Sequence, residues 1–206
     1  MTNKMRCELV SWDYFYALSL DLAFKISDSG YKPDVLIAIA RGGVIPGRVL
    51  CDFLNMMEFG CFRVEHYHGA HKKTFARIKT PLSVNVDNKR LLVVDDISDS
   101  GDTFSIAMEH ILQRGKPVEI KTATLQHKTV SQFVPDFYAQ IITEWRWVIY
   151  PWAVHEDVGG FIEAMQPTPD SIDDISQQLF EDYDIKMPYH HLLNILKLKD
   201  HPLSQE

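Results

Sequence analysis

The stretch Leu91–Thr103, LLVVDDISDSGDT, constrains the fold of this chain more than any other feature of its sequence. Leu91–Val94 form a continuous apolar run, which is typical of a strand covered on both faces in a parallel sheet. Asp95 and Asp96 follow directly, at the strand end where open α/β sheets bind their ligands. The stretch therefore predicts an α/β protein with a polar site at the carboxyl end of this strand.

The turn after the two carboxylates is rich in hydroxyl groups and leads into a helix. It contains Ser98, Ser100, Gly101 and Thr103. The unpaired N–H groups and the positive dipole end of a helix N-terminus favour an anion such as phosphate. Asp95 and Asp96 would repel phosphate, so we expect them to face a hydroxylated ring or a bridging Mg²⁺. Together these residues predict a site for a phosphorylated sugar.

Strands and helices alternate along the chain before and after this stretch. We expect strands at 34–40, 62–68, 89–95 and 118–125, and helices from Ser11 to Gly30, from Pro46 to about Leu54 and from Phe104 to Gly115. This alternation is typical of a mostly parallel sheet with right-handed crossovers. The fold class expected is a doubly wound α/β core.

The stretch Leu91–Thr103 resembles the phosphoribosyl pyrophosphate signature of type I phosphoribosyltransferases. An ordinary strand-to-helix turn with an N-cap is the alternative for such a motif in isolation. The resemblance implies a phosphoribosyltransferase-like core with a small lid or hood over residues 1–166, followed by a helical extension at 167–206. It implies Mg²⁺ as cofactor, with Asp96 as metal ligand. It also implies a donor site of Arg41, Gly42, Asp95, Asp96, Ser98, Asp99, Ser100, Gly101, Asp102 and Thr103.

A second motif, Arg41-Gly42-Gly43, ends the predicted strand at 34–40. Two glycines allow the backbone to approach a ligand closely, and the Arg41 guanidinium suits phosphate oxygens. A glycine turn with a solvated arginine is the alternative reading. The motif resembles the family loop that binds the pyrophosphate of the donor, often through a strained or cis peptide.

Basic residues are concentrated between His66 and Pro81, where apolar periodicity is weak. They are Lys72, Lys73, Arg77 and Lys79. The family resemblance implies a flexible loop here that closes over the reacting ligands. A solvated charged loop is the alternative, and a metal site at His66, His68 and His71 is disfavoured because no carboxylate or cysteine pattern accompanies them.

Residues 126–151 are expected to form the lid that receives the base. Lys128 follows the strand at 118–125, where 6-oxopurine phosphoribosyltransferases carry a lysine, and a lysine donates to O6 but not to the amino group of adenine. The segment EWRWVIYPW resembles that of xanthine-guanine phosphoribosyltransferases, which implies purine binding by Trp147 and Val148. Asp99 is the expected catalytic residue, accepting a proton from the base. Ala153 departs from the family, which has an acid there, so the preferred base stays open.

Composition limits the remaining possibilities. The net charge of −7 argues against nucleic acid or an anionic membrane as the main partner. Three cysteines without metal-ligand spacing favour reduced thiols, and no signal peptide or apolar run of membrane-spanning length is seen, so a cytoplasmic protein is expected. The partners expected are phosphoribosyl pyrophosphate, a purine base and further copies of the chain in a dimer or tetramer.

The extension at 167–206 is predicted to form two short amphipathic helices that pack or mediate oligomer contacts. A helix-turn-helix reader of DNA is disfavoured by its acidic residues. The function expected is purine salvage by a 6-oxopurine phosphoribosyltransferase. The alternative is a regulator of the same fold that senses phosphoribosyl pyrophosphate or a nucleotide. The presence of Asp99 and Lys128 favours the enzyme.

Overall fold

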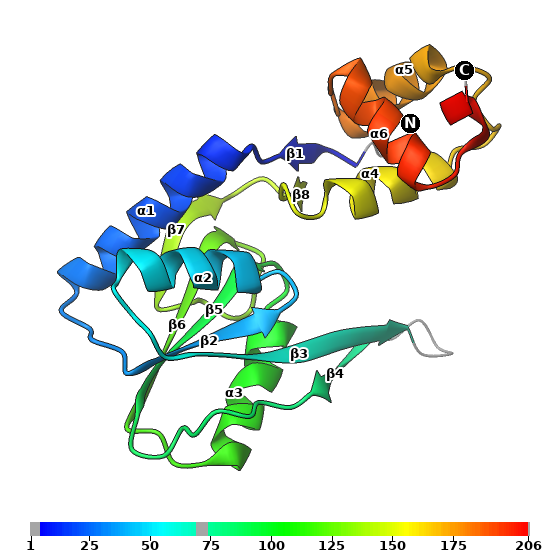
Figure 1. Ribbon diagram of the computed structural model, residues 1–206. Helices are drawn as coiled ribbons and strands as arrows, with labels where there is room; N and C mark the ends of the chain where they lie inside the picture. The colour runs from blue at the N-terminus through cyan, green and yellow to red at the C-terminus, as the bar shows by residue number, and fades with distance from the viewer. Residues whose placement is uncertain (1–4, 69–73, 206) are drawn as a thin grey trace. The chain divides into compact units, whose positions relative to one another are not determined.

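The computed structural model describes residues 5–68 and 74–205 and is shown in Figure 1. The chain divides into two compact units, one of residues 16–144 and one that joins residues 1–15 to residues 145–206. The division therefore differs from the boundary expected at residue 166. None of the helices within the described ranges has the length and apolar character that a membrane span requires.

The larger unit is built on a six-stranded sheet in the order β4-β3-β2-β5-β6-β7. Its strands are β2 (Val35–Ala40), β3 (Phe59–His68), β4 (Thr74–Thr80), β5 (Arg90–Ser98), β6 (Glu119–Lys128) and β7 (Phe137–Ile142). All neighbouring pairs are parallel except β3–β4. The mostly parallel α/β core expected from the sequence is confirmed.

Helices lie on both faces of this sheet (Figure 1). They are α1 (Trp12–Asp28), α2 (Val44–Phe53) and α3 (Asp102–Arg114). A side chain added at Gly47 of α2 would touch Leu36 and Ala38, so α2 packs on the face of β2 that carries these residues. Ile37 and Ile39, which alternate with them along β2, point to the opposite face, where α3 packs.

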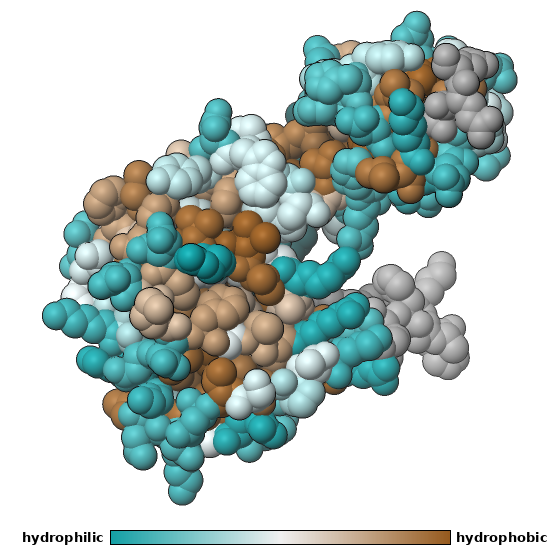
Figure 2. Space-filling model, viewed as in Figure 1, coloured by the Kyte–Doolittle hydropathy of each residue, from teal (hydrophilic) through white to brown (hydrophobic). Residues whose placement is uncertain are grey.

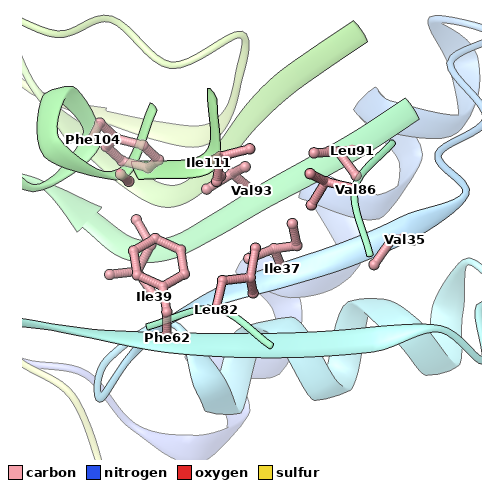
Figure 3. Packing of buried hydrophobic residues seen from close by; sticks show 11 residues of the cluster. Val35, Ile37, Ile39, Phe62, Leu82, Val86, Leu91, Val93, Phe104 and Ile111 are labelled. Atoms are coloured by element: carbon pink, nitrogen blue, oxygen red, sulfur yellow. The ribbon is translucent and has the colours of Figure 1, made fainter. Parts of the chain in front are cut away.

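The packing between α3 and the sheet forms the main apolar core (Figure 3). Its buried residues come from β2, β3, β5, α3 and the segment after β4. They are Val35, Ile37, Ile39, Phe62, Leu82, Val86, Leu91, Val93, Phe104, Ala107 and Ile111. Leu91–Val94 are fully buried, as the continuous apolar run predicted for a strand covered on both faces.

Two segments differ from their expected structure. Residues 126–151 were expected to form the lid, but β7 lies within them and joins the core sheet parallel to β6. Arg77 and Lys79 were expected in a loop, but both belong to β4, which pairs antiparallel with β3. Arg77 and Lys79 belong to the sheet because β4 pairs with β3. In the sequence, their charges obscured the alternation of side chains from which a strand is predicted.

Apolar side chains are also exposed on the larger unit, over α1 and α2 in the face that Figure 2 shows. Leu20 and Phe24 of α1 and Met57 after α2 are exposed apolar residues of this unit. Together with Leu54 and Met56 they line a groove of about 660 Å³.

The described residues of the smaller unit form a two-stranded parallel sheet, three α-helices and a 3₁₀ turn. Its elements are β1 (Cys7–Leu9), β8 (Trp147–Ile149), α4 (Val154–Glu163), α5 (Ile172–Tyr183), α6 (Tyr189–Leu198) and a 3₁₀ turn (Pro202–Gln205). The two helices predicted for the extension, α5 and α6, are confirmed. Ser171 caps α5, because its hydroxyl accepts a hydrogen bond from the Asp174 N–H at 3.1 Å.

Candidate active site

The two sequence motifs meet because β2 and β5 are parallel neighbours, with Ala38 opposite Val94. The loop Arg41–Gly43 leaves β2 after a cis peptide bond between Ala40 and Arg41. A Cβ atom at Gly42 would overlap the carboxylate of Asp96, and one at Gly43 would overlap the carbonyl oxygen of Val94. Both glycines are therefore required for the loop to lie against the end of β5.

The adjacent carboxylates of β5 lie in different environments. Asp95 is buried, and its carboxylate accepts a hydrogen bond from the Asp96 N–H at 3.0 Å. Burial, and then the charge of Asp96, raise the pKa of Asp95 well above its ordinary value. Asp96 is half-buried and lines the pocket beyond the strand. Asp96 is thus the carboxylate of the pair that keeps more exposure toward a ligand.

A pocket of about 350 Å³ opens at the carboxyl end of β5. It is lined by Asp95, Asp96, Ile97, Ser98, Asp99, Ser100, Gly101, Thr103 and Phe104. Gly101 occupies the N-cap position of α3 with φ of 94°, and the cap has no side-chain hydrogen bond. A left-handed residue at this point favours glycine and brings the start of α3 to the pocket. The stretch predicted to form a phosphate site therefore does line one cavity.

The hydroxyl groups of this turn differ in what they contact. Ser98 is buried, with its Oγ 2.8 Å from the Ser131 Oγ and donating to the Phe133 carbonyl at 3.0 Å. Ser100 is exposed and donates to the Asp102 carboxylate at 3.0 Å. The geometry favours Ser98 as a support of the loop 131–133. Ser100 and Thr103 remain the hydroxyls at the more accessible side of the turn.

An ion pair joins the ends of β5 and β6. The Lys128 Nζ lies 2.6 Å from the Asp99 Oδ2, with the lysine side chain 1% exposed and the aspartate side chain 39% exposed. Parallel pairing places Ser98 opposite His127, and this brings together the residues that follow them in the chain, Asp99 and Lys128. The residue expected to contact the base and the residue expected to take its proton are therefore bonded to each other. No sequence signal pointed to this contact.

The basic residues of the β3–β4 hairpin face a carboxylate of the same hairpin. Lys79 donates to both carboxylate oxygens of Glu65 at 3.0 Å, and Arg63 lies 3.1 Å from the same group. The hydrogen bonds from Lys79 lower the pKa of Glu65. Arg77 is exposed opposite Glu65 in the ladder. Lys72, Lys73 and His71 lie outside the described residues, as do the side chains of His66 and His68.

Trp147 and Val148 belong to β8 of the smaller unit. The Trp147 N–H donates to the Arg6 carbonyl at 2.9 Å, and the Trp147 side chain is partly exposed. Trp152 packs among aromatic residues instead, with its ring stacked 4.9 Å from Tyr150 and 5.0 Å from Phe15 in an edge contact. Ala153 is the N-cap residue of α4 and has no side chain that could cap it.

The parallel sheet, the glycine loop against the Asp96 carboxylate and the start of α3 beside the pocket define an α/β protein whose strand ends form a polar pocket of the kind that suits a phosphorylated ligand. The family model for the phosphoribosyl transferase domain matches residues 8–157. The chain belongs to this family and is thus a glycosyltransferase enzyme. The expected resemblance to type I phosphoribosyltransferases is confirmed.

Two of the similar proteins described next are named as phosphoribosyltransferases of purines, and a third has a bound nucleotide. The xanthine-guanine phosphoribosyltransferase of Idiomarina loihiensis is 26% identical over 147 residues, covering 71% of this chain and 86% of that protein. The purine phosphoribosyltransferase structure from Pyrococcus horikoshii is 32% identical, with a TM-score of 0.63 over 71% of this chain and 93% of that one. A Neisseria gonorrhoeae protein with bound ppGpp is 25% identical, with a TM-score of 0.61 over 72% of this chain and 89% of that one.

Proposed function

We propose that the protein transfers the 5-phosphoribosyl group from phosphoribosyl pyrophosphate to a 6-oxopurine base, hypoxanthine, guanine or xanthine, and releases pyrophosphate. This is a reaction of purine salvage. The observation that carries the proposal is Lys128, whose ammonium lies at the end of β6 beside the pocket, bonded to Asp99. An ammonium can donate a hydrogen bond to a carbonyl oxygen, but it has no acceptor for the hydrogens of an amino group. It therefore favours an oxopurine over adenine. The purine phosphoribosyltransferase names of the relatives support the same class.

The donor is expected to occupy the pocket at the end of β5. The start of α3 and the hydroxyls of Ser100 and Thr103 suit the 5-phosphate, because a helix N-terminus offers unpaired N–H groups to an anion. The carboxylates of Asp95 and Asp96 suit the ribose hydroxyls. The Arg41–Gly43 loop lies against Asp96, and an arginine with close backbone approach suits the pyrophosphate.

The site also fits Mg²⁺. Within residues 5–68 and 74–205, no three or more His, Cys, Asp or Glu side chains are grouped to hold a metal ion. Mg²⁺ commonly binds one or two carboxylates and takes its other ligands from water and substrate phosphates, and Asp96, with Asp95 behind it, provides that donor set. When bound, Mg²⁺ would neutralise charge on the leaving pyrophosphate.

The transfer breaks the bond between the sugar carbon and a pyrophosphate oxygen and forms a bond from that carbon to a purine nitrogen. Positive charge develops on the sugar, and the carboxylates of Asp95 and Asp96 stabilise it through the ring hydroxyls. Asp99 accepts the proton that the purine loses, and Lys128 donates to the 6-oxo group. The family resemblance further assigns the Trp147 ring to stacking on the base and the Val148 backbone to hydrogen bonding with its edge.

The alternative, a regulator that senses phosphoribosyl pyrophosphate or a nucleotide, is not favoured, because the relatives carry enzyme names and Asp99 and Lys128 are both in place. The ppGpp bound by the Neisseria gonorrhoeae relative is a guanine nucleotide, which agrees with a 6-oxopurine site on this fold.

The test is an assay of the purified protein with phosphoribosyl pyrophosphate, Mg²⁺ and each of hypoxanthine, guanine, xanthine, adenine, uracil and orotate. Formation of the nucleotide from at least one 6-oxopurine, with little from the other bases, is expected. Turnover of adenine or a pyrimidine alone would contradict the assignment to Lys128. Binding of the donor without turnover of any base would favour the regulator. Light scattering of the same sample tests the expected dimer or tetramer.

A further inference from the structure

The strand β8, which contains Trp147 and Val148, is stabilised by few hydrogen bonds to neighbouring strands. It spans three residues and, in the part of the chain that the structure describes, pairs only with β1, also of three residues, in a two-stranded sheet. An isolated pair of short strands is marginally stable in water. The orientation of Trp147 and Val148 must therefore depend on what packs against this pair.

The packing comes from the helices of the extension. Ile149, the last residue of β8, is fully buried and belongs to the second apolar core of the protein. Leu9 lies opposite Ile149 in the ladder and packs against the same core. The remaining buried members come from α4 and the chain after it: Val158, Ile162, Met165, Ile172, Ile175, Leu179, Ile185, Leu192, Ile195 and Leu196.

The link from this core to the base-binding residues is short. Ile149 is the residue directly after Val148, and its carbonyl accepts a hydrogen bond from the Val10 N–H at 2.9 Å. Trp147 and Ile149 point to the same face of the strand, because side chains alternate along it. A shift of Ile149 in the core therefore changes the position of the Val148 backbone and of the Trp147 ring. The helices α5 and α6 lie beyond residues 8–157, which the family model matches.

We propose that α5 and α6 act as a positioning element for β8 and thereby set the affinity of the enzyme for its base. Ile195 of α6 is the positioning residue with which we test this. The inference rests on the proposed function, since it takes Trp147 and Val148 as base-binding residues. It assigns the extension a role in base recognition without contact to the base.

The test compares two isoleucines in helices, each buried and each changed to alanine. Ile195→Ala leaves a cavity in the apolar core to which Ile149 of β8 belongs, whereas Ile26→Ala leaves one in α1 of the larger unit. Small displacements of positioning groups cost up to about 100-fold, so Ile195→Ala is expected to raise the KM for the base by roughly tenfold or more. The KM for phosphoribosyl pyrophosphate is expected to stay within about twofold. Ile26→Ala is expected to lower the Tm without changing the KM for the base.

Ile195→Val keeps most of the volume and is expected to restore the KM for the base nearly to that of the wild type. If Ile195→Ala does not fold, Leu192→Ala of the same core serves as the test variant, with the same expected rise in the KM for the base. A folded Ile195→Ala with a lowered Tm and an unchanged KM for the base would overturn the inference. Equal rises in the KM for base and donor in both alanine variants would do the same. A wild-type protein that turns over no base would instead refute the proposed function, so the two failures are distinguishable.

Discussion

The carboxylate of Asp99 lies 2.6 Å from the ammonium of Lys128, a lysine whose side chain is almost entirely buried. A buried ammonium is costly without a partner, so Asp99 stabilises Lys128 when no base is bound. A 6-oxopurine offers a carbonyl oxygen to the same ammonium, and its ring nitrogen offers a proton to the same carboxylate. Under the proposed function, the base would therefore replace both partners of the ion pair at once.

The first prediction concerns Asp99. Asp99→Asn is expected to lower kcat by about 10²–10⁴-fold, because general-base assistance contributes that range, while the Kd for phosphoribosyl pyrophosphate changes little. The variant also removes the negative charge that lies 2.6 Å from the buried Lys128 ammonium, so its Tm should fall. Kinetics, calorimetric titration of the donor and thermal unfolding measure the three effects. Wild-type kcat across the accessible pH range would remove the catalytic role of Asp99.

The second prediction concerns Lys128. Lys128→Ala is expected to raise the KM for hypoxanthine or guanine, because the 6-oxo group loses its hydrogen-bond donor. Lys121→Ala is the matched control: it removes a lysine of the same strand, whose Nζ lies 3.0 Å from Asp136 at the surface. That control should leave the KM for the base unchanged. If both variants bind the base like the wild type, Lys128 does not read the 6-oxo group.

The third prediction concerns the adjacent carboxylates of β5. Replacing Asp95 and Asp96 together by asparagine removes the carboxylates of the site, and a charge-assisted hydrogen bond to an ionised carboxylate such as that of Asp96 is worth about 1.5–3 kcal/mol. Donor binding and turnover should fall sharply. The fold should survive, because burial already raises the pKa of Asp95 and the neutral amide relieves that cost. Asp21→Asn, on the exposed side of α1, is the control. Saturable donor binding at wild-type affinity in the double variant would contradict the donor site.

The fourth prediction is a loss of stability in acid through His110. Its Nε2 accepts a hydrogen bond from the Leu82 N–H at 3.0 Å, and burial, with the charge of Arg114, lowers its pKa below 6.5. The folded protein thus binds this proton less readily than the unfolded chain, so its contribution is complete above about pH 6.5 and is lost as the pH falls toward the folded pKa. Urea unfolding of the wild type and of His110→Gln from pH 7.5 to 5 measures it. The free energy of unfolding should change less with pH in the variant than in the wild type. An equal change in both would exclude His110 as the source of the acid sensitivity.

Much of the fold could be predicted from the sequence because its signals are local. The apolar run Leu91–Val94 indicated a strand buried on both faces, and the carboxylates after it indicated the ligand end of a parallel sheet. The glycine pair after β2 was placed at the same site. The helices α5 and α6 followed from their periodicity. Each of these features depends on neighbouring residues in the chain.

The features that could not be predicted depend on distant contacts. The sequence does not distinguish a turn serine that faces a ligand from one that, like Ser98, donates a hydrogen bond to the Phe133 carbonyl. The pairing of Lys79 with Glu65 requires the antiparallel register of β3 and β4. The assignment of β7 to the core sheet depends on its pairing with β6. The shared core of β8 and the extension joins segments at opposite ends of the chain.

The close approach of Gly42 to the Asp96 carboxylate has a consequence for how this site can vary. Any Cβ at position 42 would occupy the space of that carboxylate. The residue tolerated at position 42 therefore depends on the residue at position 96. A larger residue at 42 becomes compatible only with a smaller or displaced residue at 96, and a protein that changed both would lose its accessible carboxylate at this strand end. Random mutagenesis of either position alone should therefore recover few active variants, whereas a library that varies the pair together would show which combinations of loop and charge the fold permits.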